Sequence, residues 1–255
     1  MKFKALIIAS ILSLGLHAEE TITVAATPVP HAEILEQVKP ELQKQGYKLQ
    51  IKEFTDYVLP NLAVDSGEVD ANFFQHTPYL EEFNKSKHTK LTKVINVHIE
   101  PMAVYSKKYK SLDDIKQGAK IAIPNDPTNE SRALDIIAKK GLVKFQDKAL
   151  KTPLDITYNP KKLQFIELKA AQLPRALDDV DFAVINSNYA LSANLNPAKD
   201  SVFIEDKQSP YANILVVKTG NENDAKIKAL AKALQSDKVK NFIIEKYKGS
   251  VLPAF

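Results

Sequence analysis

The chain has 255 residues and contains no cysteine. Disulfide bonds, catalysis by a thiolate and metal sites built on cysteine are therefore excluded. We also expect no lipid anchor, because attachment beside a signal peptide requires a cysteine there. Stability must come from a hydrophobic core, which a chain of this length can supply.

Glycines are few and catalytic motifs are missing. Only seven glycines occur, with no G-x-G-x-x-G and no Walker A loop, so phosphate-cradling loops are not expected. The hydrolase motifs G-x-S-x-G, S-x-x-K and H-E-x-x-H are absent from the sequence. The histidines do not cluster at the spacing of zinc ligands; they are His17, His31, His76, His88 and His98. We therefore expect a binding cleft rather than an enzyme, with no cofactor and no metal.

No apolar run is long enough to span a bilayer comfortably. The longest, from Ala5 to Leu16, follows the basic residues Lys2 and Lys4 and precedes a small-residue cleavage site at Ala18. This pattern is typical of a secretory signal peptide. We assign residues 1–18 to it and expect a mature chain outside the cytoplasm.

The charge is nearly balanced, with a formal net charge of +4 to which the predicted signal peptide contributes. The densest basic stretches are residues 85–90 and 107–110. Neither alternates with aromatic residues as a nucleic-acid groove does. We interpret both as solvated faces and expect no nucleic-acid partner.

The order of predicted elements repeats. Residues 20–26 alternate like a strand, 31–45 follow as a helix, and 47–54 form a second strand, which is a parallel β-α-β unit. A strand, a proline turn and a helix recur over residues 120–140. Two lobes of similar α/β construction are predicted.

Polar turns follow the predicted strands at four places. Ligands of open α/β sheets bind outside the carboxyl ends of the strands. A cleft between two facing lobes would bring these turns together; they are residues 27–31, 75–79, 124–132 and 186–189.

Arg132 lies in the first turn of the helix that follows the strand 121–123. Free backbone N–H groups at that end favour an anion, and a guanidinium matches a carboxylate or phosphate bidentately. The alternative is an arginine paired with Glu130 or a nearby aspartate, and the local sequence does not decide between them.

The remaining turn residues suit a free amino acid. Asn186 and Asn213 could offer carbonyl oxygens to an α-ammonium group. An apolar pocket could be walled by Tyr57, Phe74, His76 and Tyr79. The ordinary alternatives are packing tyrosines, a histidine that caps a helix, and asparagines that end a strand or form a turn. Phe73 and Phe74 are neighbours in one strand, so one should enter the core and the other line the cleft.

The sequence resembles the NlpA/MetQ family of methionine-binding proteins of ABC importers. The resemblance covers essentially the whole mature chain. Its motifs are ATPVPHAEIL (26–35), FTDYVLPN (54–61), DANFFQHTPYLEEFNK (70–85), HIEPMAVYSKKYKSL (98–112), IAIPNDPTNESRAL (121–134), AQLPRALDDVDFAVINSNYAL (171–191) and PYANILVV (210–217).

The resemblance implies the two-lobed periplasmic binding protein fold, type II-like, with two crossover strands as its hinge. Lobe 1 would comprise residues 19–103 and 218–255, and lobe 2 residues 104–217. The family's ligand arginine corresponds to Arg132 and its ligand asparagines to Asn186 and Asn213. Its aromatic pocket corresponds to Tyr57, Phe74, His76 and Tyr79.

The resemblance also implies the function. The protein would be a periplasmic monomer that captures L-methionine between its lobes and delivers it to an inner-membrane ABC permease and its ATPase. One alternative is a receptor for D-methionine or for a methionine-containing dipeptide such as Gly-Met. A second is an envelope adhesin or antigen without a transport role.

Overall fold

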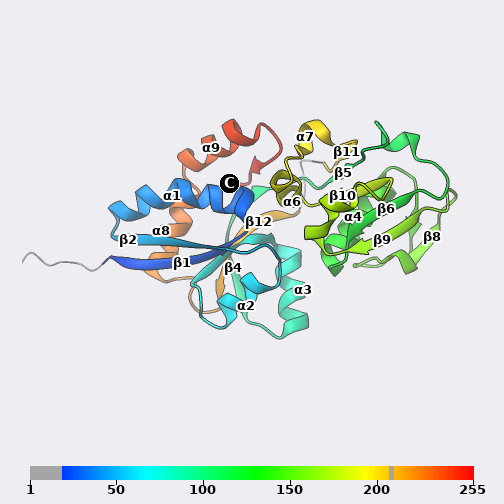
Figure 1. The fold of residues 1–255 in the computed structure, drawn as a ribbon. Coiled ribbons are helices and arrows are strands. Elements are labelled where there is room, and N and C mark those ends of the chain that lie inside the picture. The colour runs from blue at the N-terminus through cyan, green and yellow to red at the C-terminus, as the bar shows by residue number, and fades with distance from the viewer. Residues whose placement is uncertain (1–18, 207–209) are drawn as a thin grey trace, which may run out of the picture.

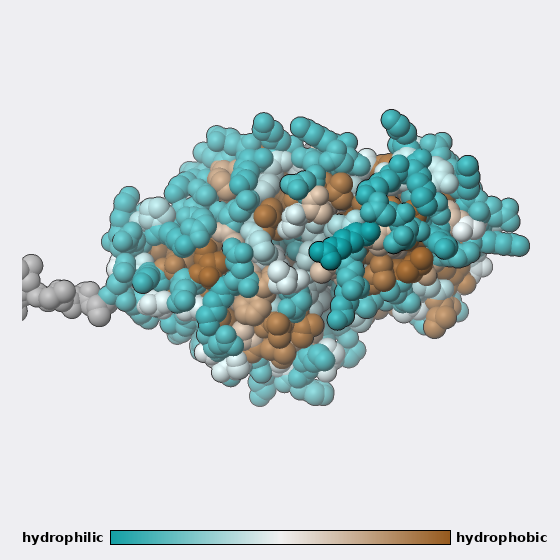
Figure 2. Space-filling view, viewed as in Figure 1, coloured by the Kyte–Doolittle hydropathy of each residue, from teal (hydrophilic) through white to brown (hydrophobic). Residues whose placement is uncertain are grey.

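The computed structural model describes residues 19–206 and 210–255, and the predicted signal peptide lies outside the described residues. Two α/β lobes stand side by side in Figure 1, which confirms the predicted two-lobed architecture. The face shown in Figure 2 is largely hydrophilic, with smaller hydrophobic areas on both lobes. Within the described ranges, none of the helices has the length and apolar character needed to cross a membrane.

The first lobe is built on a six-stranded sheet in the order β13-β4-β12-β3-β1-β2. Strand β1 pairs in parallel with β2 and β3, as the β-α-β pattern predicts, whereas β12 runs antiparallel to β3 and β4. The strands are β1 (Glu20–Ala26), β2 (Tyr47–Glu53), β3 (Ala71–His76), β4 (Leu91–Ile99), β12 (Ala212–Lys218) and β13 (Leu252–Pro253).

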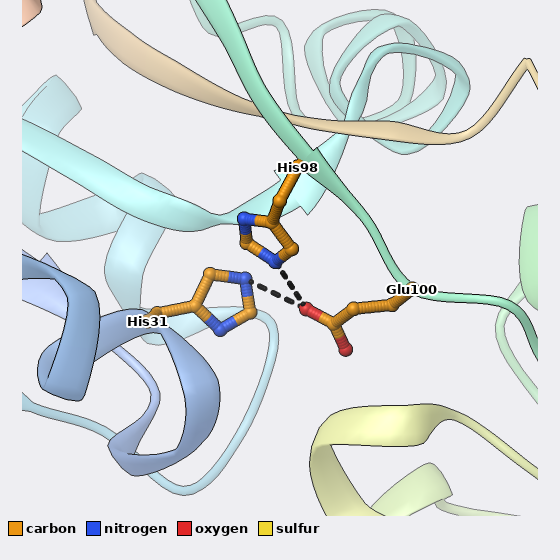
Figure 3. A group of neighbouring side chains, drawn as sticks. All are labelled: His31, His98 and Glu100. Atoms are coloured by element: carbon orange, nitrogen blue, oxygen red, sulfur yellow. Dashed lines mark hydrogen bonds and ion pairs between the residues drawn. The ribbon is translucent and has the colours of Figure 1, made fainter. Parts of the chain in front are cut away.

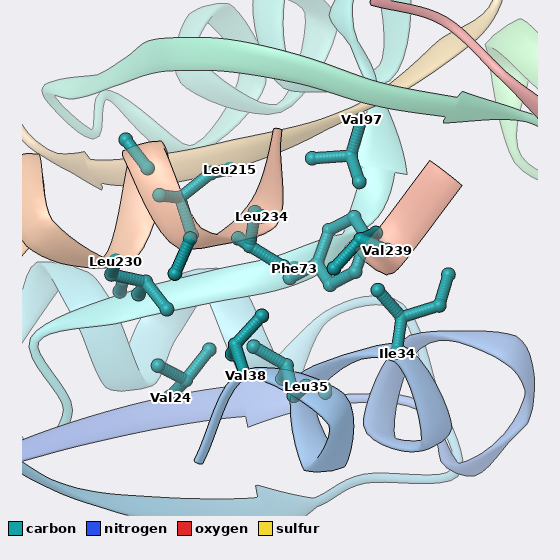
Figure 4. Close-up of a cluster of buried hydrophobic side chains, with 14 of the residues drawn as sticks. Val24, Ile34, Leu35, Val38, Phe73, Val97, Leu215, Leu230, Leu234 and Val239 are labelled. Carbon is teal, nitrogen blue, oxygen red and sulfur yellow. The ribbon is translucent and has the colours of Figure 1, made fainter. Parts of the chain in front are cut away.

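Helices cover both faces of this sheet. Successive strand residues point to opposite faces, so Val24 packs in the cluster of Figure 4 while its neighbour Ala25 packs in a second cluster on the other side. The first face is covered by α1 (Glu33–Lys44), α8 (Ala225–Leu234) and α9 (Asp237–Tyr247). The second is covered by α2 (Leu59–Asp65) and α3 (Thr77–Lys87).

The second lobe is built on a five-stranded sheet in the order β11-β5-β10-β6-β9. Its strands are β5 (Ala103–Tyr105), β6 (Lys120–Pro124), β9 (Gln164–Leu168), β10 (Phe182–Ile185) and β11 (Phe203–Ile204), beside a hairpin of β7 (Lys144–Phe145) and β8 (Ile156–Tyr158). Its helices are α4 (Pro127–Lys139), α5 (Leu173–Ala176), α6 (Ser187–Ser192) and α7 (Pro197–Asp200).

The chain passes from the first sheet to the second at residues 100–102, between β4 and β5, close to the predicted lobe boundary at 103/104. The predicted second boundary, with lobe 2 extending to residue 217, is wrong. Strand β12 pairs with β3 from Asn213 to Val217, so residues 212–217 belong to the first sheet and not to the second lobe. The reason is that this apolar run is a central strand, buried between β3 and β4, rather than a connector.

Candidate functional site

A small cavity lies between the two lobes, with about 340 Å³ of empty space including the part that opens to solvent. Its walls come from the end of β3 and the start of α3 on one side, and from α4 and α6 on the other. Six of the seven predicted site residues line it: Tyr57, Phe74, His76, Tyr79, Asn186 and Asn213. Arg132 is not among its lining residues.

One wall of the cavity is aromatic. The ring of Tyr57 lies 5.9 Å from those of Phe74 and Tyr79, and the latter two are 6.0 Å apart. Phe73 is fully buried in the core of Figure 4 while Phe74 faces the cavity, which confirms the predicted split of this pair. The hydroxyl of Tyr57 donates to Asn188 Oδ1 at 2.6 Å and so joins the two lobes.

Both tyrosine hydroxyls stay protonated. Burial raises the pKa of Tyr57 and that of Tyr79 well above the ordinary range. Tyr79 donates to the backbone oxygen of Tyr57 at 2.8 Å, which fixes one ring against the other. The wall is therefore an ordered, mostly apolar surface with its hydroxyls already used.

His76 ends β3 and caps α3. Its Nδ1 accepts the backbone N–H of Tyr79 at 3.1 Å, so the ring proton is on Nε2, which donates to Asn129 Oδ1 at 3.1 Å. Burial, with the nearby charge of Arg132, lowers the pKa of His76 to about 3. The ring is therefore neutral, and His76 is both the predicted cap and a cavity residue.

Asn129 connects His76 to Asn186 by hydrogen bonds. Its Oδ1 also accepts from Asn186 Nδ2 at 2.9 Å, and its own Nδ2 donates to Asp126 Oδ1 at 2.9 Å. These bonds leave Asn186 Oδ1 buried without a hydrogen-bond partner among the described residues. The cavity thus contains an unused acceptor on one of the two asparagines predicted to bind an ammonium group.

The other predicted asparagine is oriented by a histidine. His31 Nε2 lies 3.1 Å from Asn213 Oδ1, and its Nδ1 lies 2.7 Å from the hydroxyl of Thr27. A carbonyl oxygen has two lone pairs, so Asn213 Oδ1 keeps one for a ligand.

Two of the histidines lie together in space, although they are not spaced along the chain as zinc ligands are. The rings of His31 and His98 lie 4.9 Å apart, and both Nε2 atoms approach Oε1 of Glu100, which lines the cavity. Figure 3 shows this group. The two histidines come from different elements, and their spacing along the chain does not indicate their contact.

Arg132 lies behind the cavity and is held by another acid. Its Nε donates to Glu205 Oε1 at 3.1 Å and its Nη2 to Glu205 Oε2, while Nη2 also donates to the backbone oxygen of Glu100 at 2.9 Å. The guanidinium stacks 4.2 Å from the ring centre of Tyr211. Its partner is thus neither Glu130 nor a nearby aspartate, and its role toward a ligand stays a prediction.

Five lining residues were not named individually from the sequence: Gln75, Glu100, Asn129, Ser187 and Asn188. Four of them lie in the polar turns 75–79, 124–132 and 186–189, which were predicted to meet at the cleft. Glu100 is different, because it lies in the connection between the lobes. The sequence feature that could have pointed to Glu100 is its position as a charged residue between an apolar strand and a proline.

Comparisons with known proteins identify the family of this chain. The model of the NlpA lipoprotein family matches residues 22–255. The membrane lipoprotein TpN32 of Treponema pallidum is 43% identical over 251 residues, covering 95% of this chain and 94% of that protein. The D-methionine-binding lipoprotein MetQ of Escherichia coli is 46% identical over 212 residues, covering 82% of this chain and 78% of MetQ.

A solved structure is similar over nearly the same range. It is a nutrient binding protein from Burkholderia cenocepacia bound to methionine, 47% identical, with a TM-score of 0.90 over 92% of this chain and 100% of that one. Fold, sequence and family model therefore agree, and the chain belongs to the NlpA lipoprotein family.

Proposed function

We propose that this chain is a substrate-binding protein that captures methionine between its two lobes and supplies it to an ABC importer. The observation that carries the proposal is the cavity between the lobes, which gathers an aromatic wall and unused polar acceptors. Relatives whose names state methionine binding support it. The proposal assigns no reaction to the chain.

The methionine side chain would lie against the rings of Tyr57, Phe74 and Tyr79. Burial of such a side chain is worth about 1.5–3 kcal/mol, and each contact of a thioether sulfur with a ring about 0.3–1.5 kcal/mol. We expect the walls of this cavity to fit one amino-acid side chain closely.

The backbone part of the ligand would meet the polar side of the cavity. Asn186 Oδ1 and Asn213 Oδ1 would accept from the α-ammonium group. Arg132 bonds to the backbone of the cavity residue Glu100, so its guanidinium lies directly behind the cavity. We keep it as the partner of the α-carboxylate, in competition with Glu205.

Binding would favour the closed arrangement of the lobes. A ligand that touches both lobes stabilises the closed state relative to an open one, and hinge motion at the two crossings would exclude water. The Tyr57–Asn188 hydrogen bond is an example of a contact that exists only when the lobes are together.

Titration calorimetry with L-methionine tests the proposal, after native mass spectrometry of the purified protein has identified any ligand already bound. We expect saturable binding of one methionine per chain. D-methionine and Gly-Met should be titrated in parallel, because MetQ of Escherichia coli is named for D-methionine. If no methionine compound binds, an envelope protein without a transport role becomes the better interpretation.

We further propose that the protein acts in the periplasm, as a monomer, with an inner-membrane permease and its ATPase. Several relatives are named lipoproteins, so the comparisons do not support the expectation that it lacks a lipid anchor, and we leave that expectation out of the proposal. Cell fractionation and light scattering would test location and oligomeric state.

A further inference from the structure

We infer that the carboxylate of Glu100 is the counter-charge for the ligand's ammonium group, and that the site therefore selects ligands with a free α-amine. The inference rests on the proposed function, because it concerns the same cavity. It adds a charged residue to a site in which only neutral side chains were predicted to meet the ammonium group.

Glu100 is held in place by neutral donors. Its Oε1 lies 2.7 Å from His98 Nε2 and 3.2 Å from His31 Nε2 (Figure 3). The proton on His31 Nε2 is shared between Glu100 Oε1 and Asn213 Oδ1. The backbone N–H of Asn188, on the second lobe, also acts on this carboxyl group and lowers its pKa. Glu100 is only 6% exposed, so the orientation of its carboxyl group is set by these contacts.

Neither histidine neutralises this carboxylate. Burial lowers the pKa of His31 to about 4 and that of His98 to about 3, so both rings are neutral near pH 7. They supply N–H groups that orient Glu100 but no full positive charge. The short contacts of Figure 3 are therefore hydrogen bonds to a carboxylate rather than ion pairs.

The nearest arginine has another partner. The guanidinium of Arg132 pairs with the carboxylate of Glu205 and reaches Glu100 only at its backbone oxygen. Within the part of the chain that the structure describes, no lysine or arginine forms an ion pair with the Glu100 side chain. Burial raises the pKa of Glu100, and the charge of Arg132 opposes this rise without cancelling it, so the buried carboxylate remains incompletely compensated. A ligand cation in the cavity would remove this cost.

The donors of an ammonium group match the acceptors of the cavity. An α-ammonium group has three N–H donors, and burying it with neutral partners alone leaves its charge uncompensated. Asn186 Oδ1, Asn213 Oδ1 and the carboxylate of Glu100 offer three acceptors around one cavity. Only Glu100 offers charge, so it should contribute more than either asparagine.

A metal ion is the other occupant that these residues suggest, because His31, His98 and Glu100 place their ligand atoms within 4.8 Å of one another. Zinc bonds of about 2.0–2.1 Å would keep tetrahedral ligand atoms roughly 3.3 Å apart. His98 Nε2 and Glu100 Oε1 are closer, at 2.7 Å, and among the described residues His98 Nδ1 has no partner to orient the ring. The geometry favours the hydrogen-bonded carboxylate.

The test compares L-methionine with 4-(methylthio)butanoate, the same molecule without its ammonium group. Both are titrated calorimetrically, directly or by competition, into wild type, Glu100→Gln and the control Glu130→Gln. Glu130 controls for placing an amide at a buried glutamate, because it is 5% exposed and does not line the cavity; burial raises its pKa to about 8, so this change removes little charge. We expect Glu100→Gln to weaken methionine binding by about tenfold or more and butanoate binding by less than about threefold. Glu130→Gln should leave the ratio of the two affinities unchanged.

Equal losses for both ligands in Glu100→Gln, or no loss for methionine, would overturn the inference and leave the proposed function intact. A wild-type protein that binds neither ligand would instead overturn the proposed function, and the inference with it. If Glu100→Gln does not fold, a crystal structure of the wild type with methionine decides. We expect the ammonium nitrogen about 2.7–3.0 Å from a Glu100 carboxylate oxygen, and a separation beyond about 4 Å would overturn the inference.

Discussion

The pair formed by Arg132 and Glu205 allows structural and ligand-binding roles of one arginine to be separated. Both side chains are almost fully buried, at 4% and 7% exposure. Replacing Arg132 by methionine would leave the Glu205 carboxylate buried without its cation. Breaking one side of such a pair costs about 3–5 kcal/mol, and the stacking on Tyr211 adds up to about 2 kcal/mol.

The double variant should behave differently. Arg132→Met with Glu205→Met removes both charges and keeps apolar volume, which is often neutral or stabilising for a buried pair. We expect Arg132→Met to unfold roughly 6–28 °C below wild type, from a loss of about 3–7 kcal/mol at about 2–4 °C per kcal/mol for a protein of this size. The double variant should recover most of that loss. Thermal unfolding followed by circular dichroism measures both.

Methionine binding should not recover with stability. If Arg132 binds the α-carboxylate, both variants lose at least about a hundredfold in affinity, which is the worth of two charge-assisted hydrogen bonds. A double variant that regains both stability and methionine affinity would refute the ligand role of Arg132. A double variant as unstable as Arg132→Met would refute the argument that the unpaired carboxylate causes the loss.

Two further predictions follow from the cavity. Tyr57→Phe removes the 2.6 Å hydrogen bond to Asn188 and keeps the ring. Because one hydrogen bond between the lobes is lost, methionine affinity should fall about threefold to tenfold. An unchanged affinity in calorimetry would mean that this bond does not contribute to closure. The buried rings of His31, His76 and His98 have a lowered pKa in the folded chain, near 4, 3 and 3, against an ordinary value of 6.5. The unfolded chain therefore binds protons first, so the free energy of unfolding should be largest above about pH 6.5 and fall as pH drops from there toward 4. Urea unfolding between pH 7.5 and 4.5 measures this, and a flat profile would contradict neutral burial of these rings.

Patterns of neighbouring residues predicted the elements and many of the cavity residues. The alternation of residues 20–26 and 47–54 and the helix between them specify a parallel β-α-β unit, because side-chain direction depends on local backbone period. The same rule separated Phe73 from Phe74. Polar turns after strands predicted where His76 and Asn186 would lie, since carboxyl ends of parallel strands share one edge.

Local patterns also failed in an identifiable way. Strand β12 was assigned to the wrong lobe at residues 212–217, because an apolar run can cross between sheets or lie at the centre of one, and periodicity does not distinguish these cases. Its position between β3 and β4 depends on the completed sheet.

The sequence by itself determined the α/β elements, the repeated lobe and the class of site, since these depend on period, turn chemistry and residue type within a short stretch. Only the tertiary structure decided that Arg132 pairs with Glu205 and that His31 and His98 meet at Glu100. Such contacts join residues far apart in the chain, and no local pattern specifies which distant charge or ring the packing of two lobes will bring within a few ångströms.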